Sequence, residues 1–220
     1  MGFVFFGSSA IAILIGLLIG AVVIFISNSS EALDGLRTLL AGPVEDGMLG
    51  IGRVLYYAVP IIMTGLSVGF AFKTGLFNIG TPGQFIIGAF AAVYVGVKWT
   101  FLPGSIHWLV AILAAFAAGG LWAVIPGVMK AYLNVNEVIS SIMMNYIGMY
   151  LVNYSVSLVL FDALRNQSLP VASTAVIPKM GFDKIFTGSP ANGGFVIAIL
   201  FVILIYIILN KTSFGYEMKA

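Results

Sequence analysis

Residues 3–26 read FVFFGSSAIAILIGLLIGAVVIFI, a continuous apolar run without a charged side chain. A bilayer core is about 30 Å thick, and a helix of about 20 residues crosses it. A spanning β-strand would instead alternate apolar and polar residues over about ten positions. A secretion signal is not favoured, because no Lys or Arg precedes the run and no small-x-small cleavage site follows it. The stretch therefore predicts a retained transmembrane helix.

The composition of the whole chain extends this prediction. Of the 220 residues, 60% are apolar and 8% are charged, whereas an average soluble domain is about half apolar and about a quarter charged. So few charges cannot cover a water-facing surface without large apolar patches. The same apolar content excludes a disordered chain, and a net charge of +2 is too small for a nucleic-acid-binding surface. The chain is predicted to be an integral membrane protein in a lipid bilayer.

Further apolar stretches without charge place the other helices, because a charge at the centre of a span is unfavourable by about 2.5–3.5 kcal/mol. The six predicted spans are residues 3–26, 54–72, 82–97, 108–129, 138–160 and 193–209. We therefore expect an all-α, polytopic helix bundle in which residues 1–220 form a single transmembrane domain. The short loops 73–81, 130–137 and 210–220 carry basic residues at the higher density, which predicts a cytoplasmic N-terminus.

A polar stretch, KTGLFNIGTPGQ at residues 73–84, separates two of these spans and predicts an interrupted helix near 75–84. Thr81 as N-cap, Pro82 at the first helical position and Gln84 at the third would form a capping box. The helix that follows would end near Val97 and be only about 24 Å long. Irregular backbone at membrane depth survives only in protein or beside a wet cavity, and it marks binding regions in transporters. The alternative is an ordinary capped turn at the membrane surface.

A second polar feature lies on the helix predicted from 138 onwards. Glu137, Ser141 and Asn145 are four residues apart and share one helix face, which should avoid lipid. This stripe could line a pathway, or it could join helices while Glu137 stabilises the positive end of the helix dipole. For Asn145 we expect a buried role between helices.

Several kinds of chemistry have no residues to carry them. The chain has no cysteine and one histidine, His107, which we expect in a loop at the membrane surface rather than as a metal ligand. Inside the membrane no Ser/His/Asp set is possible and no paired carboxylates exist, and the chain has no G-x-x-x-x-G-K-[ST] phosphate loop. We therefore expect no catalytic residues, no metal site and no enzyme. Energy for transport would come from another subunit, or a solute would move downhill.

Several motifs together resemble one protein family. They are PIIMTGL (60–66), FKTGLFNIG (72–80), GQ (83–84), KA (130–131), VNEVI (135–139) and MNY (144–146). In this order they resemble the permease subunits of bacterial ABC importers of the simple sugar and nucleoside (branched-chain amino acid/ribose-type) family, closest to nucleoside permeases that work with a lipoprotein receptor. The tail TSFGYEMKA (212–220) resembles the start of that family's cytoplasmic loop, which docks on the ATPase.

The resemblance implies roles for named residues. Those implied near the substrate pathway are Phe77, Asn78, Gly80, Gln84, Asn136, Glu137 and Asn145. Gly215, Tyr216 and Glu217 would begin the ATPase-coupling element. The implied function is import of a nucleoside-like solute through a bacterial cell membrane. The alternatives are a ribose-type sugar permease and an ATP-independent secondary carrier or channel.

The resemblance also implies partners. A separate ABC ATPase subunit would use ATP, so this chain would bind no cofactor itself. A second permease subunit, identical or different, and an extracytoplasmic solute-binding lipoprotein would complete the importer, and the loop 161–192 is a candidate docking surface for that lipoprotein.

Two features depart from the family pattern. Pro82 stands where the family often has an acidic residue just before the Gly-Gln pair, so recognition of the solute would differ here. The sequence stops at Ala220 inside the coupling loop, so we expect an N-terminal fragment of a longer permease.

Overall fold

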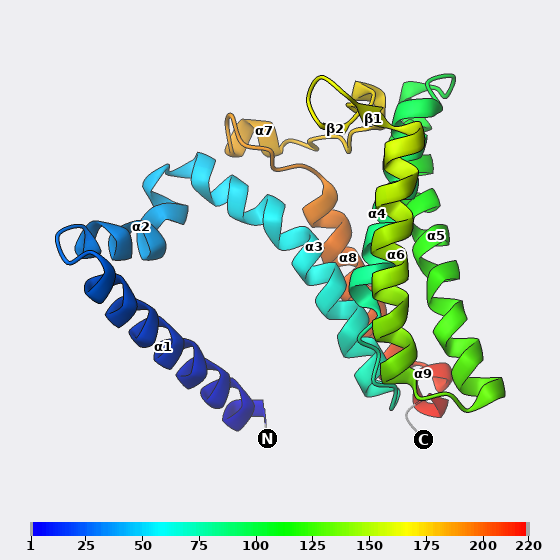
Figure 1. Ribbon diagram of the computed structural model, residues 1–220, viewed down its shortest axis with the longest axis horizontal. Helices are drawn as coiled ribbons and strands as arrows, with labels where there is room; N and C mark the ends of the chain where they lie inside the picture. Colours follow the sequence, from blue (N-terminus) through cyan, green and yellow to red (C-terminus); the bar gives the residue numbers. More distant parts are fainter. Residues whose placement is uncertain (1, 219–220) are drawn as a thin grey trace. The chain divides into compact units, whose positions relative to one another are not determined.

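The computed structural model describes residues 2–218, with side chains described except at 2–6, 9 and 43 (Figure 1). Lys219 of the predicted inside loop, and Ala220 of the 212–220 motif, lie outside the described residues. The chain divides into two compact units. One contains the chain up to Val54 together with Asp183–Pro190, and the other contains Leu55–Phe182 and the chain from Ala191 onwards.

The first unit is built from α1 (Gly2–Ser27), α2 (Ala32–Glu45), the first turns of α3 (Met48–Lys73) and most of the short helix α7 (Phe182–Ile185). Helix α1 is the apolar run from which the sequence predicts the first span. A short turn separates it from α2, and Gly47, whose φ is 58°, lies between α2 and α3. Arg53 on α3 pairs with Asp46 just before it at 2.9 Å.

The second unit contains the rest of α3 and the remaining elements. They are α4 (Thr81–Lys98), α5 (Gly104–Leu133), α6 (Glu137–Val159), β1 (Phe161–Asp162), β2 (Gln167–Ser168), the 3₁₀ helix η1 (Ser173–Ala175), α8 (Gly194–Lys211) and α9 (Ser213–Glu217). Helix α4 packs against both α5 and α6, which run beside it (Figure 1). The two strands form a small antiparallel hairpin in which Phe161 lies opposite Ser168.

Five described helices are long and apolar enough to cross a membrane, namely α1, α3, α5, α6 and α8. Their apolar side chains are widely exposed in the isolated chain, as expected for helices that lipid surrounds. The all-α, polytopic fold predicted from the sequence is confirmed. Helix α4, which contains the predicted span 82–97, is not among the five, and its first turn carries Thr81 and Gln84.

Among the helix ends that differ from the predicted ranges, two differ for a common reason. Helix α3 begins at Met48 rather than at residue 54, and α5 continues to Leu133 rather than ending at 129. The predicted ranges end at charges, but a helix continues through a charged residue such as Arg53 or Lys130 once it leaves the apolar region. Helix α2 was not predicted for a similar reason, because its charged residues exclude it from the apolar stretches and it lies between the predicted spans 3–26 and 54–72.

His107 corrects a second prediction. It is fully buried rather than exposed in a surface loop, because α5 begins at Gly104 and places it in the first helical turn. Its Nδ1 lies 2.8 Å from the Thr174 hydroxyl, and its Nε2 lies 3.1 Å from the Val95 carbonyl oxygen. His107 therefore joins the end of α4 to η1, inside the long 161–192 segment.

Candidate functional site

The predicted interruption near 75–84 lies between α3 and α4. Gly75, with φ 75°, closes α3 in a Schellman motif, in which its own N–H donates to the Phe72 carbonyl at 3.3 Å. The N–H of Leu76 donates to the Ala71 carbonyl at 3.0 Å. Residues 76–80 then run without regular structure until α4 begins. The glycine is what lets the chain leave the helix in a left-handed turn.

Asn145 on α6 holds this connection with both ends of its amide. Its Oδ1 accepts a hydrogen bond from the Gly83 N–H at 2.9 Å, and its Nδ2 donates to the Ile79 carbonyl at 2.9 Å. A Cβ at Gly83 would lie only 2.9 Å from the Asn145 Cα, so the two helices touch where no side chain intervenes. The interhelical role expected for Asn145 is confirmed, but the residue is half-buried rather than buried.

The predicted capping box is wrong. The N-cap is Gly80, whose φ of −75° and ψ of −2° are already helical, so Thr81 lies inside the first turn. The Thr81 hydroxyl oxygen is buried and has no hydrogen-bond partner among the described residues. An N-terminal N–H of a helix needs an acceptor from outside the helix ladder, and Asn145 of another helix supplies it to Gly83.

Two local contacts shape the connection itself. The Asn78 side-chain oxygen accepts from the Gly80 N–H at 2.7 Å, an Asx turn that holds the buried Gly80 in place. The ring of Phe77 stacks on Phe72 at the end of α3, with centroids 5.0 Å apart and planes 10° from parallel. The irregular segment is therefore held in a defined shape.

A cavity of about 440 Å³ lies beside this connection, between α3, α5 and α6. Four predicted pathway residues line it: Phe77, Asn78, Gln84 and Glu137. Gly80, Asn136 and Asn145 are not among its lining residues. Gly80 and Asn145 instead hold the adjoining connection, through the bonds of the Gly80 N–H to Asn78 and of the Asn145 amide to Gly83 and Ile79. Asn136 caps α6 by accepting from the N–H groups of Val138 and Ile139.

The cavity also has lining residues that the sequence analysis did not assign to a pathway. These are chiefly Ser67, Phe70, Thr74, Lys130 and Ser141. A signal for the α3 residues was present, because Ser67, Phe70, Ala71 and Thr74 are spaced i, i+3, i+4 and i+7 and so share one face of a helix. Ser141 was noted only as part of the polar stripe of α6.

Lys130 and Glu137 form an ion pair of 2.9 Å at the cavity wall. It joins the end of α5 to the start of α6 across a tight turn, in which Asn134 adopts a left-handed conformation with φ 50°. The Ser141 hydroxyl donates to the Glu137 carbonyl one turn further along. The side chains of Lys130 and Glu137 are 40% and 25% exposed, so the pair forms a partly solvated, polar wall.

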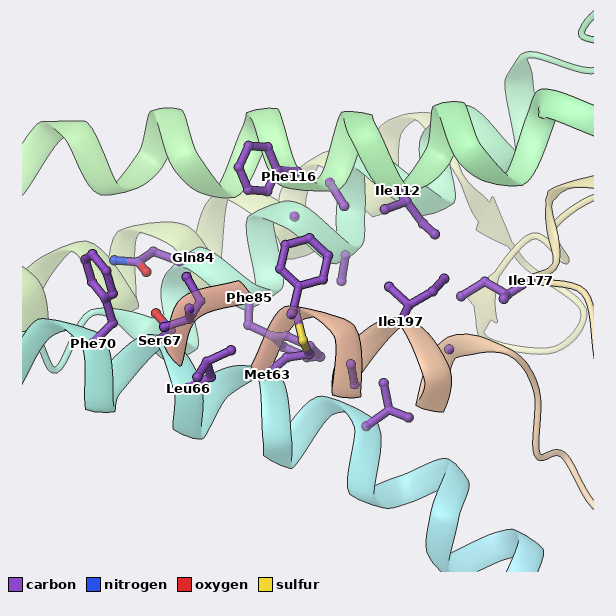
Figure 2. A pocket seen from close by; sticks show the side chains of 18 residues that line it. Met63, Leu66, Ser67, Phe70, Gln84, Phe85, Ile112, Phe116, Ile177 and Ile197 are labelled. Carbon is purple, nitrogen blue, oxygen red and sulfur yellow. The ribbon is translucent and has the colours of Figure 1, made fainter. Parts of the chain in front are cut away.

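A second cavity of about 550 Å³ lies between α3, α4, α5 and α8 and is almost entirely apolar. Ser67, Phe70 and Gln84 line both cavities. In Figure 2 these three residues lie together at one end, whereas Ile112, Ile177 and Ile197 lie at the other. Gln84 is therefore placed where the polar cavity meets the apolar one.

The predicted coupling residues lie on α9, directly after α8. Thr212 caps this short helix by accepting from the Gly215 N–H at 3.1 Å, and Gly215 is buried against the end of α8. Tyr216 is 78% exposed, and Glu217 is exposed beside it. The geometry leaves both side chains free to meet another protein. Among residues 2–218, no group of three His, Asp or Glu side chains could hold a metal ion.

Comparison with known proteins places the chain in a family. Residues 50–220 match the model for the branched-chain amino acid transport system permease component. The guanosine ABC transporter permease protein NupP of Bacillus subtilis is 39% identical over 96% of this chain and 59% of its own length. The nucleoside permease NupB of Lactococcus lactis is 29% identical over 96% of this chain and 58% of its own.

A third relative, the glucose ABC transporter permease TsgB13 of Haloferax volcanii, is 30% identical over 97% of this chain and 57% of its own length. The chain thus spans less than three fifths of these curated relatives. No solved structure matches it. The resemblance noted from the motifs is confirmed: the chain belongs to the permease-component family of the branched-chain amino acid transport system, a family of membrane subunits of ABC transporters.

Proposed function

We propose that this chain is the pathway-forming part of an ABC importer permease that carries a nucleoside-class solute into a bacterial cell. The observation that carries the proposal is the cavity at the α3–α4 connection, whose wall combines an aromatic ring with side-chain amides. Two relatives named for guanosine and for nucleosides support the solute class. A relative named for glucose makes a simple sugar the second candidate.

The cavity suits an uncharged solute with a flat face. Its volume of about 440 Å³ lies within the range of about 300–1,000 Å³ that is usual for small-molecule sites. Phe77 would contact the face of a nucleobase, while Asn78 and Gln84 would exchange hydrogen bonds with its polar edge. Pro82 is not among the lining residues, so the proposed solute contacts are Phe77, Asn78 and Gln84 and do not include position 82.

The remaining parts of the importer belong to the same proposal. A separate ATPase subunit would bind ATP and pull on Gly215, Tyr216 and Glu217, with the N-terminus of this chain in the cytoplasm. A second permease subunit would complete the pathway. A solute-binding lipoprotein would deliver the solute to the outer face at 161–192, where His107 holds η1 to the bundle.

Replacement of Phe77 tests the proposed solute contact. In the intact importer, Phe77→Ala should raise the KM for guanosine uptake about tenfold, because loss of an aromatic–base stack weakens binding by about 1–3 kcal/mol. Phe101→Ala is the matched control, since Phe101 is 76% exposed and lines neither cavity. Unchanged guanosine uptake in Phe77→Ala would contradict the proposal.

The same assay separates the alternatives. Glucose or ribose that competes with labelled guanosine, and itself accumulates, would favour the sugar permease. Uptake into sealed vesicles that continues without ATP or the partner ATPase would favour a secondary carrier or channel.

A further inference from the structure

Helix α2 is amphipathic, and the pathway proposal makes no use of it. Leu33, Leu36, Leu40 and Val44 are spaced i, i+3, i+7 and i+11, so they fall within an arc of about 80° on a helix that turns about 100° per residue. Asp34, Thr38 and Glu45 occupy the opposite face. This arrangement, an apolar stripe along one face and polar groups along the other, is typical of a helix that lies between two different surroundings.

In the unit that contains α2, three of the four stripe residues are largely exposed, and Leu36 is half-buried. Leu33, Leu40 and Val44 are 72%, 62% and 63% exposed. Helix α1 touches a different face of α2, because a Cβ at Gly35 would meet the Ile24 side chain at 3.7 Å. The stripe is therefore free to meet something other than α1.

The neighbours of α2 along the chain determine where it can lie. Helix α1 ends at Ser27 and α3 begins at Met48, and both are long and apolar enough to cross a membrane. The connection 28–31 can reach about 14 Å at most, and the connection 46–47 is shorter still. Helix α2 itself is about 21 Å long, too short to cross a core of about 30 Å. It is therefore held at the membrane surface.

We propose that α2 lies in the plane of the membrane surface, with the stripe Leu33–Leu36–Leu40–Val44 buried among lipid acyl chains. Its polar face then meets water, and Arg37, which lies about 20° from Val44 at the edge of the stripe, reaches Glu45 on that face in an exposed ion pair of 3.1 Å. Because the polar face carries acidic as well as basic residues, burial of the apolar stripe rather than attraction to anionic lipid holds the helix in place. The partner is thus the bilayer, not another protein.

Labelling at single positions tests this placement. Residues 1–220 contain no cysteine, so Leu40→Cys introduces one unique site within them for an NBD fluorophore. In phosphatidylcholine liposomes, the label at position 40 should emit at shorter wavelength and be quenched severalfold more by doxyl-labelled lipid than a label at Thr38→Cys. The Thr38 label lies on the polar face of the same turn and should be quenched by aqueous iodide instead. Val44→Cys gives a second site on the stripe.

Each outcome decides the question. Strong lipid quenching at positions 40 and 44, with iodide quenching at 38, supports the placement. Equal iodide access at all three positions would overturn it. A label at 40 that both quenchers fail to reach would also overturn it, because a protein surface rather than lipid would then cover the stripe. None of these results depends on whether the chain transports a nucleoside.

Discussion

Asn145 satisfies two backbone groups that no other described side chain reaches, the Gly83 N–H and the Ile79 carbonyl. A buried backbone group that loses its partner destabilises a protein by about 1–3 kcal/mol. Asn145 is therefore one of the residues that fix the course of the α3–α4 connection, although it does not itself line the cavity.

Substitutions of Asn145 should follow a graded order. Asn145→Leu leaves the buried Gly83 N–H unpaired, whereas water can replace the bond to the carbonyl of the exposed Ile79. The free energy of unfolding should therefore fall by about 1–3 kcal/mol, with loss of solute uptake. Asn145→Asp keeps the acceptor for Gly83 and should be intermediate. Thermal unfolding in detergent measures this order, and Asn153→Leu, on an exposed part of the same helix, is the control that should change little. Equal stability of all three variants would contradict the proposed role of Asn145 in holding the α3–α4 connection.

Some of the site residues could be predicted from the sequence, and others could not. The stripe Glu137, Ser141 and Asn145 was found because its spacing is periodic, and Asn145 does lie between helices. The N-cap of α4 was misplaced because Asn145, distant in sequence, supplies the acceptor that a local Thr81 was expected to give. A long-range contact of this kind leaves no local pattern, and the buried His107 was missed for the same reason.

At the scale of the elements, the break between α3 and α4 depends on Gly75. With φ 75°, it occupies a conformation that is unfavourable by about 1–2 kcal/mol for a residue with a side chain.

The apolar spans were predictable because they lack charge. This criterion does not detect a helix that continues past a charge, as α3 does, or one that lies along the surface, as α2 does. The helical spacing of Leu33, Leu36 and Leu40 was the sequence pattern that could have predicted α2.

Gly75→Ala should therefore destabilise the protein by about 1–2 kcal/mol and disturb the connection that follows. The matched control is Gly65→Ala in the middle of α3, where a Cβ would have no neighbour within 4 Å. Alanine is favoured over glycine inside a helix by about 0.5–1 kcal/mol, so this control should be neutral or stabilising. Thermal unfolding of the two variants measures the difference, and an equal effect of both would contradict the role given to Gly75.

At the scale of the whole molecule, the proposed pathway and the proposed coupling element lie on different parts of one unit. The α3–α4 connection, α5 and α6 surround the polar cavity, whereas α9 follows α8 at the other end of the sequence. Ser67, Phe70 and Gln84 connect the polar cavity to the apolar cavity that α8 lines. A movement of α8 would therefore change the apolar cavity directly and reach the polar one through these three residues.

This arrangement predicts that coupling and solute contact can be separated by mutation. In the intact importer, Tyr216→Ala should reduce solute-stimulated ATP hydrolysis and uptake severalfold, because it removes an exposed aromatic side chain of the kind that dominates protein interfaces. The KM for the solute should stay near its original value, unlike that of Phe77→Ala. Tyr154→Ala is the control, since Tyr154 is 65% exposed on the spanning helix α6. A raised KM with normal ATP hydrolysis in Tyr216→Ala would place Tyr216 in the solute pathway instead, and the coupling role would be lost.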